Sequence, residues 1–428
     1  MDLLNRKELK KFFDDSSDNV TGVRYAKKVK NGVVTDELSI VHSVMKKKSI
    51  GDVDVKDRIL PYIAIDGQLF KTDVVEETLP VMMTCYADSN NPNIQRLRGN
   101  PTLLSPTKGG NQILQFPTGW QPAPGGGFYT SVGTLGFFAV DNYDNKVVGV
   151  TNSHVACYNR LYCSERDPNS ELIDPYNTVQ LHPWTNVQPN EYYPGAVVTN
   201  GGNLYLGYQY LKRYQPVTND GMNFVDCALM IGNSESGWVD SASYQMWGPT
   251  DVTQNTQYMP FATTSEIDNL LSTNPNLYST GRTTGPKGWG PGSSCILRCS
   301  AVNEYTVVSD GAFNQDWGDC IRFQYLDTSP DPVAGGDSGS CIWADFSGTW
   351  KIIGLVFAGN PTYRYGLACR IDRVASIMNI RAWDSSYVLD KNYPNQTLIT
   401  AFAPGSPEAA MATKTINGVV FWQAGYGT

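Results

Sequence analysis

Short apolar segments that alternate with turns fill most of this chain, and they limit the folds open to it. From residue 128 onward the sequence reads FYTSVGTLGFFAV, KVVGVTNSHV, FVDCALMIG and WKIIGLVFAG, with turns rich in Gly, Asn, Asp and Pro between such runs. Runs of β-branched and aromatic residues bounded by turn formers are typical of antiparallel strands. Only 264–273 has the pattern of a helix in this stretch. We therefore predict a mainly β body, built as a sandwich or as barrels.

Charged residues are concentrated at the N-terminal end. Of the first 80 residues 28 are charged, 14 of each sign, whereas the other 348 hold 19 basic and 27 acidic residues. A shift of this size predicts a domain boundary near residue 80. Because acids match bases in the first segment, its charge runs are interpreted as solvated faces and not as a binding patch.

The first 80 residues have the pattern of a small α+β domain. An amphipathic helix is predicted over 3–13, and the Asn31-Gly32 pair predicts a hairpin turn before the strand LSIVHSVM. The turn-rich residues 81–127 are interpreted as a linker that wraps the body. Residues 379–428 are a C-terminal extension that ends in a hairpin-like segment, TINGVVFWQAGYGT.

The charge and hydropathy of the chain argue against two classes of partner. The net charge is −8 and the pI is about 5.0, whereas a nucleic-acid binder needs a basic face. No apolar run approaches the roughly 18 residues of a membrane span, so no membrane partner is expected. The charged start, MDLLNRKELKKFFDD, is unlike a secretory signal and predicts a protein that is cytoplasmic at synthesis.

The nine cysteines do not form a metal-binding pattern. There is no C-x₂-C pair, and with three histidines in the chain a structural zinc site is not expected. Reduced, buried thiols are the default without a secretory signal. Pairing of Cys341 with Cys369, or of Cys157 with Cys163, stays open for an oxidising compartment.

Three segments carry candidate catalytic side chains. His154 lies in TNSHV after a strand, Asp226 lies in FVDCAL, and Ser338 lies in GGDSGS before a strand. A serine hydroxyl is a weak nucleophile at neutral pH, so it needs a base within hydrogen-bond reach, and the base needs an orienting acid. Histidine is the side chain whose ordinary pKa suits the base. These residue types therefore point to nucleophilic catalysis by serine.

The choice of acid rests on the surroundings of each aspartate. Asp226 lies inside an apolar run, where a buried acid requires a partner. It is preferred on this ground over three other acids, Asp174, Asp220 and Asp240.

Glycines around the serine predict a sharp turn. Such a turn can point the backbone N–H groups of Gly336 and Ser338 at one spot, which would form an oxyanion hole.

The order His154, Asp226, Ser338 along the chain resembles that of the trypsin/chymotrypsin-like serine proteases. The passage from GTLGFFAV to GVTNSHV is similar to their first-barrel hairpin, TGRTTG to the turn that opens their second barrel, and IIGLVFAGN to the strand that lines their substrate pocket. The resemblance implies two six-stranded antiparallel β-barrels in a domain over 128–378. The first barrel would span about 128–240 and the second about 275–378.

The N-terminal part of the sequence resembles one branch of these proteases in particular. VRYAKKVKNGVVTDELSIVHSVMKKK, DRILPYIAIDG and TDVVE are similar to motifs of bacterial and plant trypsin-like peptidases that carry an N-terminal accessory domain. The approach PGGGFYTSVGTLG also fits this branch. The similarity covers about residues 20–378 and leaves the extension unexplained.

The resemblance assigns roles to individual residues. His154 would be the general base, Asp226 the orienting acid and Ser338 the nucleophile, with Gly336 and Ser338 as the oxyanion donors. No cofactor and no metal are implied.

The resemblance also locates the substrate pocket. Its floor would lie near Asp331 and Pro332, and its edge at Phe357, Ala358 and Gly359. Because no acid lies squarely at the floor, we expect a small or apolar residue before the cut and not a strict preference for Arg or Lys. No basic-residue–IVGG sequence precedes the first barrel, so the acid before the serine, Asp337, has no new N-terminus to pair with.

Two functions of different classes remain open. The first is a serine endopeptidase acting on protein or peptide substrates. The second is a structural or assembly component of a virus or phage particle built on a protease-like scaffold, with or without activity. The Asn-, Thr-, Gly- and Tyr-rich body and the extension favour the second, which would form homo-oligomers or particles through its terminal segments and would be virion-associated.

Overall fold

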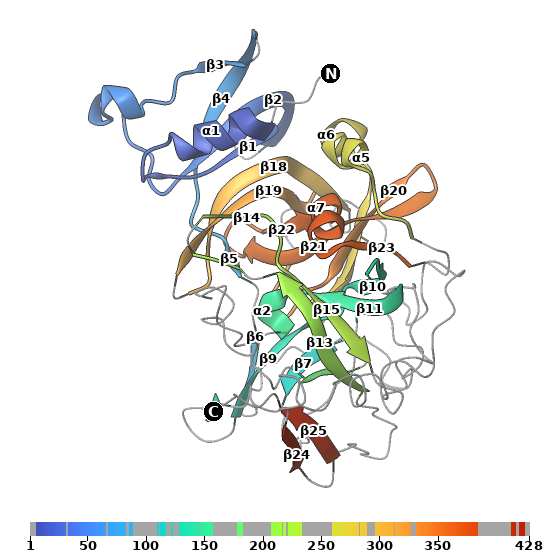
Figure 1. The fold of residues 1–428 in the computed structure, drawn as a ribbon. Helices are drawn as coiled ribbons and strands as arrows, with labels where there is room; N and C mark the ends of the chain where they lie inside the picture. The colour runs from blue at the N-terminus through green and yellow to red at the C-terminus, as the bar shows by residue number, and fades with distance from the viewer. Residues whose placement is uncertain are drawn as a thin grey trace.

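The structure is a computed structural model, and it describes residues 6–88 and 109–383 with internal gaps, together with a hairpin at 412–416 and 419–423. The largest internal gaps are 157–177, 183–206 and 233–258. Two large β-sheets form the body, with the N-terminal unit above them in Figure 1. The hairpin consists of β24 (Ala412–Ile416) and β25 (Val419–Gln423).

Six strands close into a barrel in the second half of the body. The order is β19-β22-β21-β20-β16-β18, and an additional β18–β19 pairing closes the ring. Every pairing around it is antiparallel. The strands are β16 (Leu277–Gly281), β18 (Leu297–Ser309), β19 (Asn314–Tyr325), β20 (Cys341–Phe346), β21 (Thr349–Asn360) and β22 (Tyr365–Arg370).

The other sheet forms the first barrel in the order β10-β11-β15-β13-β12-β7-β9. Only Leu135 and Gly136 separate β9 from β10, so the two ends of this path belong to one bent chain segment, which makes six strands in all. The strands are β7 (Gln112–Phe116), β9 (Phe128–Thr134), β10 (Phe137–Asp141), β11 (Lys146–Thr151), β12 (Thr178–His182), β13 (Gly207–Gln215) and β15 (Cys227–Gly232).

The N-terminal unit continues the sheet of the second barrel. Its strand β1 (Val20–Lys30) pairs with β18 on one side and with β2 (Val33–Val44) on the other. Next come β4 (Gln68–Glu76), parallel to β2, and β3 (Tyr62–Ile65). The helix α1 (Arg6–Asp14) buries Leu9 in a cluster with Tyr305 of β18. Two 3₁₀ turns, Ile50–Asp52 and Val55–Asp57, complete the unit.

Shorter elements connect these parts. Residues 81–127, which the sequence suggested as a linker, hold β5 (Val81–Met82), β6 (Cys85–Asp88), β7 and β8 (Gln121–Pro122), and these strands pair with both barrels. The other elements are α2 (Ser153–Ala156), β14 (Met222–Asn223), α5 (Thr264–Asp268), α6 (Leu270–Thr273), β17 (Gly285–Lys287), α7 (Ile371–Met378) and β23 (Ile380–Ala382).

The prediction of a mainly β fold with two six-stranded antiparallel barrels after a small α+β unit is confirmed by these pairings. The helix predicted over 264–273 is present as α5 and α6, separated at Asn269. A capping box at Thr263 and Glu266 fixes its start. β1 and β2 pair antiparallel, while the turn predicted at Asn31-Gly32 between them lies outside the described residues.

Five cysteines with described side chains are buried and form no disulfide: Cys227, Cys299, Cys320, Cys341 and Cys369. Pairing of Cys341 with Cys369 is wrong because both lie opposite Leu355, on the two flanking strands. Two strand spacings amount to about 10 Å, beyond the roughly 7 Å that a disulfide allows between Cα atoms. Cys157 and Cys163 lie outside the described residues.

A buried cluster of charges joins the N-terminal unit to the second barrel. Glu77 accepts hydrogen bonds from Arg24 (3.0 Å), Arg322 (2.8 Å) and the Ser43 hydroxyl (2.9 Å). Glu304 of β18 lies 3.9 Å from both guanidinium groups. Burial alone would raise the pKa of Glu77, but Arg322 and Arg24 together outweigh it and lower the pKa to about 2. Burial raises the pKa of Glu304, only partly opposed by the same two arginines.

This cluster predicts a loss of stability in acid. The pKa of Glu77 is lower in the folded protein than its ordinary 4.5, so its contribution is present above about pH 4.5 and is lost as the pH falls towards 2. At about 1.4 kcal/mol per unit the loss is on the order of 3 kcal/mol. Glu77→Gln should lack this part of the acid dependence, measured as denaturant unfolding between pH 5 and pH 2.5. Glu37→Gln, which removes an exposed ion pair with Lys71, should keep it. Parallel acid profiles for wild type and Glu77→Gln would contradict the assignment.

Candidate active site

Antiparallel pairing of β11 with β15 brings two of the predicted residues together. Thr151 at the end of β11 lies opposite Ala228 near the start of β15. The chain then turns into α2, which carries His154, while Asp226 directly precedes β15. The side-chain amide of Asn152 donates to the Asp226 carbonyl at 2.7 Å and holds the two segments in register.

The carboxylate of Asp226 is buried and fully engaged. Its Oδ2 contacts Nδ1 of His154. Its Oδ1 accepts the backbone N–H groups of Ser153 (2.7 Å) and His154 (3.2 Å), and also the Ser153 hydroxyl. Burial alone would raise the pKa of Asp226, but the His154 ring and these hydrogen bonds outweigh burial and lower the pKa. Asp226 is therefore a carboxylate at neutral pH.

An ionised Asp226 fixes the tautomer of His154. The carboxylate accepts the proton on Nδ1, so Nε2 of the neutral ring carries the lone pair. Nε2 is buried and has no hydrogen-bond partner among the described residues. An unpartnered acceptor on an oriented imidazole is the arrangement that a general base requires.

Ser338 lies in a tight turn held between the two barrels. Gly336 and Gly339 have φ values of 96° and 88°, in the region that favours glycine. A Cβ on Gly339 would lie 2.2 Å from the Thr134 carbonyl oxygen, so no other residue fits there. Thr134 at the end of β9 donates its N–H to the Ser338 carbonyl at 2.8 Å. The turn is thereby fixed to the first barrel although it belongs to the second.

The contacts of Gly133 relate the turn to the histidine. A Cβ built there would meet Val155, the neighbour of His154, at 2.4 Å and the Ser338 carbonyl at 3.0 Å. Val155 and Ser338 thus lie against the same residue of β9. The Ser338 hydroxyl donates to the Phe357 carbonyl at 3.3 Å, and Nε2 of His154 does not accept it in this state.

Backbone N–H groups of the turn divide into two sets. Those of Asp337, Gly339 and Ser340 donate to the carbonyls of Ala334, Val356 and Asp337. None of the backbone–backbone bonds among the described residues outside regular strands and helices engages the N–H of Gly336 or Ser338. These are the two groups that the sequence suggested as oxyanion donors.

A buried lysine stabilises the Ser338 turn through Asp337. Asp337 Oδ1 accepts the N–H groups of Thr283 (2.9 Å) and Thr284 (3.1 Å), and its Oδ2 accepts the Thr284 hydroxyl (2.6 Å). Lys287 of β17 lies 3.3 Å from Oδ2, and both side chains are buried. Burial lowers the pKa of Lys287, partly opposed by Asp337.

Sequence reasoning missed this partner. Asp337 was expected to have no new N-terminus to pair with, because no activation sequence precedes the first barrel, and no other partner was predicted. The charge comes instead from Lys287, two residues after the TGRTTG turn. The available signal was a lysine at the end of TGRTTGPK, a segment that contains no acid.

The predicted pocket residues lie around the turn in different roles. Pro332 is buried, while its neighbour Asp331 is exposed and lies 3.7 Å from Arg364. Phe357 turns its ring onto Trp317, with 4.2 Å between centroids, so only its carbonyl faces Ser338. Ala358 and Gly359 pair with Met82 and Val81 of β5.

The other candidates lie apart from this site. His42 is buried in β2, and burial, together with the nearby Arg24, lowers its pKa to about 4. The three competing acids, Asp174, Asp220 and Asp240, lie outside the described residues.

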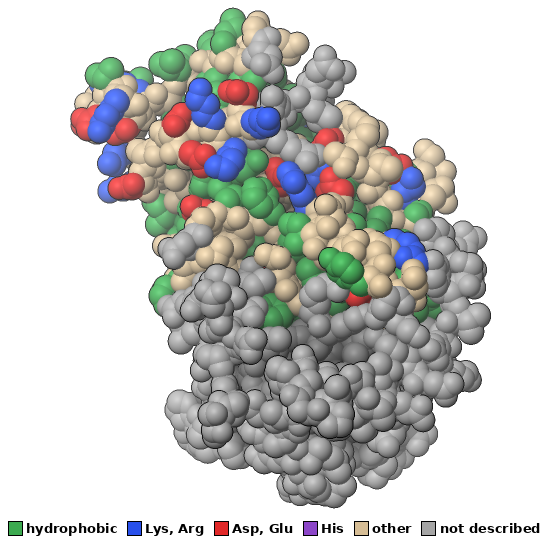
Figure 2. Space-filling view, viewed as in Figure 1, with side chains coloured by type: hydrophobic (Ala, Val, Ile, Leu, Met, Phe, Trp, Pro, Cys, Tyr) green, Lys and Arg blue, Asp and Glu red, His purple; other side chains and the backbone are tan. Residues whose placement is uncertain are grey.

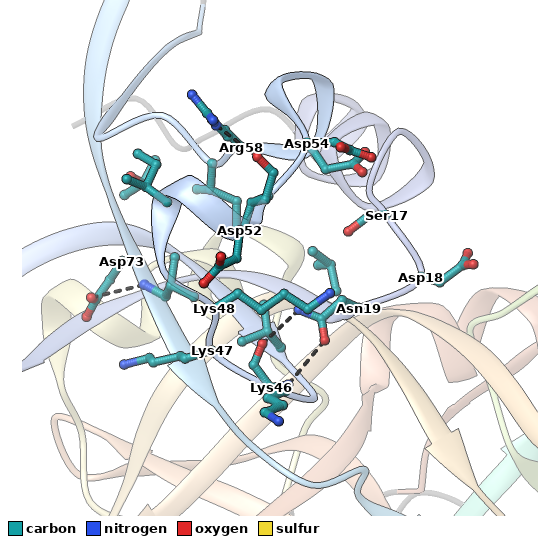
Figure 3. A pocket seen from close by; sticks show the side chains of 18 of the residues that line it. Ser17, Asp18, Asn19, Lys46, Lys47, Lys48, Asp52, Asp54, Arg58 and Asp73 are labelled. Carbon is teal, nitrogen blue, oxygen red and sulfur yellow. Dashed lines mark hydrogen bonds between the residues drawn. The ribbon is translucent and has the colours of Figure 1, made fainter.

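A cavity of about 920 Å³ lies in the N-terminal unit and contains none of the predicted catalytic residues. Figure 3 shows Lys46, Lys47 and Lys48 among the residues that line it, together with Asp52 and Asp73. Figure 2 shows the same mixture of both signs over the surface of this unit. A mixture of this kind does not form a patch of one sign.

Within the described ranges there is no group of three or more side chains able to hold a metal ion. None of the helices in the described part of the chain combines the length and the apolar character of a membrane span.

Comparison with known proteins gives similarity in structure only. No protein-family model and no curated protein matches the chain. The Nocardiopsis protease NAPase is 15% identical with a TM-score of 0.36, over 64% of this chain and 97% of that protease. Thermobifida fusca protease A is 12% identical with a TM-score of 0.35, over 65% of this chain and 98% of its own. A glutamic acid-specific serine protease is 15% identical with a TM-score of 0.35, over 65% of this chain and all of its own.

Identities at this level transfer neither activity nor specificity, and the fold rests on the strand pairing described above. Two closed six-stranded antiparallel barrels make this protein a chymotrypsin-like fold. An N-terminal unit that shares the sheet of the second barrel extends this fold.

Proposed function

We propose that this protein is a serine endopeptidase that hydrolyses peptide bonds through an acyl-enzyme intermediate. The observation that carries the proposal is the buried His154–Asp226 pair, whose Nε2 has no partner among the described residues, while Val155, the next residue, and the Ser338 turn both lie against Gly133. A buried ionised carboxylate that orients a buried imidazole has a high cost in desolvation. Its retention next to a constrained serine favours catalysis over a purely structural role.

The first half of the reaction forms an ester. The Ser338 hydroxyl rotates from the Phe357 carbonyl to Nε2 of His154, which takes its proton as Oγ attacks the carbonyl carbon of the substrate. Negative charge on the carbonyl oxygen meets the N–H groups of Gly336 and Ser338. Collapse of this intermediate breaks the peptide bond, and the proton on Nε2 passes to the leaving amine.

The second half releases the acid. Water loses a proton to Nε2 as it attacks the ester carbon, and the proton returns to Oγ when the C–O bond to Ser338 breaks. Asp226 stays ionised throughout and stabilises the imidazolium ion of each step. A small or apolar residue on the acyl side of the cut is proposed, because Asp331 points to Arg364 at the surface.

A fluorophosphonate probe tests the proposal. The full-chain protein should be labelled on Ser338 in a prolonged reaction, with the site mapped by mass spectrometry. Ser338→Ala should remain unlabelled, because the probe needs an activated serine. Ser340→Ala is the matched control, since this serine lies in the same segment but its hydroxyl makes no hydrogen bond to described residues. Wild-type protein that stays unlabelled while folded would overturn the proposal.

A further inference from the structure

One edge of β21 passes directly beside the nucleophile. On the opposite edge, β22 pairs with β21 from Gly354 to Asn360. On this edge, β20 pairs with β21 only as far as Leu355, which lies opposite Cys341. Next along it, Val356 exchanges hydrogen bonds with Gly339 and Ser340, both of 2.8 Å. The Phe357 carbonyl then accepts the Ser338 hydroxyl. An extended peptide that reaches Ser338 can therefore pair only with the residues of this edge that follow Phe357.

β5 already occupies those residues. Met82 lies opposite Ala358 and Val81 opposite Gly359, in antiparallel register. The part of this edge that β20 leaves unpaired, next to Ser338, is therefore occupied by the protein's own chain.

The next described strand after β5 belongs to the other barrel. β6 begins three residues after Met82, and its first residue, Cys85, pairs with Val132 of β9 in the first barrel. Val132 precedes Gly133, which lies against the Ser338 carbonyl. β5 is thus paired with the second barrel and β6 with the first, and both strands are labelled in Figure 1.

Several contacts hold β5 in place. The Pro80 carbonyl accepts the N–H of Ser309 at 2.9 Å, and the Thr78 carbonyl accepts the side-chain amide of Asn360 at 2.8 Å. Glu77 is fixed in the charge cluster described above. Met82 is 7% exposed within the core cluster of the second barrel, whereas Val81 is 37% exposed.

We propose that residues 78–82 are an internal occupant of the substrate-binding edge, so that the protein as folded here is a latent peptidase. This inference rests on the proposed function. A tethered strand competes with a free peptide at a high effective concentration. Substrate can pair with Ala358 and Gly359 only in the fraction of molecules whose β5 is displaced, and the apparent rate falls by that fraction. Release of β5 is the regulatory step.

The test compares one substitution at two neighbouring positions in the full-chain protein. Met82→Asp places a charge in the core and should displace β5, whereas Val81→Asp faces solvent and should not. The rate of fluorophosphonate labelling should rise about tenfold or more in Met82→Asp over wild type and Val81→Asp. A synthetic peptide of residues 76–82 should slow the labelling of Met82→Asp again. Hydrogen exchange of residues 356–360 is measured in parallel, and it should speed up only in Met82→Asp.

The outcomes separate the inference from the function on which it rests. Equal labelling rates in wild type and Met82→Asp would overturn latency and leave the peptidase intact. Faster exchange at 356–360 with no labelling in either protein would overturn the peptidase function and latency with it. If Met82→Asp loses exchange protection in β19 as well, Asn360→Ala replaces it, because this change removes the Thr78 anchor without placing a charge in the core.

Discussion

Replacing Asp226 with asparagine is expected to lower turnover about 10⁴-fold while the fold is retained. The asparagine Oδ1 can still accept the backbone N–H of Ser153, but its amide group would donate to Nδ1 of His154. The proton of the ring then moves to Nε2, which can no longer accept a proton from Ser338. The rate is measured as kcat on a peptide found by library profiling, or as the rate of fluorophosphonate labelling.

The control for this change is Asp345→Asn in β20, which alters a side chain that accepts the N–H of Gly348 at the far end of the strand. Its rate should equal that of the wild type. A rate in Asp226→Asn that also equals the wild type would mean that another acid orients the base.

Replacing Lys287 with methionine is expected to lower the free energy of unfolding by about 3–5 kcal/mol, because it leaves Asp337 buried without its counter-charge. Asp337 lies between the two proposed oxyanion donors, so the rate of Ser338 labelling should fall as well. Unfolding by denaturant and labelling of the folded fraction measure the two effects.

Two further variants define the origin of that loss. Lys351→Met removes the partly exposed pair with Glu266 and should cost at most about 1 kcal/mol. Lys287→Met combined with Asp337→Asn removes both charges and should recover part of the stability. A double variant less stable than Lys287→Met alone would contradict a charge effect and point to packing of the lysine stem.

Most of the fold could be predicted from local sequence patterns. The barrels follow from strand-length apolar runs, and the helical region over 264–273 follows from residues within a few positions of each other. SSCILRCSAV and YTVVSD are two separate strand-like runs in the sequence, with polar Asn303 and Glu304 between them. The structure has one strand, β18, with irregular register around Ala301–Thr306 and a φ of 55° at Asn303.

The polar break was misread because its partners are distant in the sequence. Asn303 contacts the buried Arg370, and Glu304 lies near Arg24 and Arg322. Lys287 under the Ser338 turn and β5 on β21 escaped prediction for the same reason. Each depends on a pairing across tens to hundreds of residues, and no periodicity along the chain encodes it. His154, Asp226 and Ser338 were found because each lies in a motif of its own.

The shared sheet has a consequence for any attempt to obtain the barrels alone. β18 offers Ala301, Val302, Tyr305 and Thr306 to β1 as an outer edge. Cutting the chain near residue 80 would leave this stretch of backbone donors and acceptors unpaired, and an exposed edge of this kind recruits strands from other molecules. The same cut would remove Arg24 and Glu77 from the side of Arg322 and Glu304. The N-terminal unit thus serves the barrels as protection against aggregation, independently of any role in catalysis.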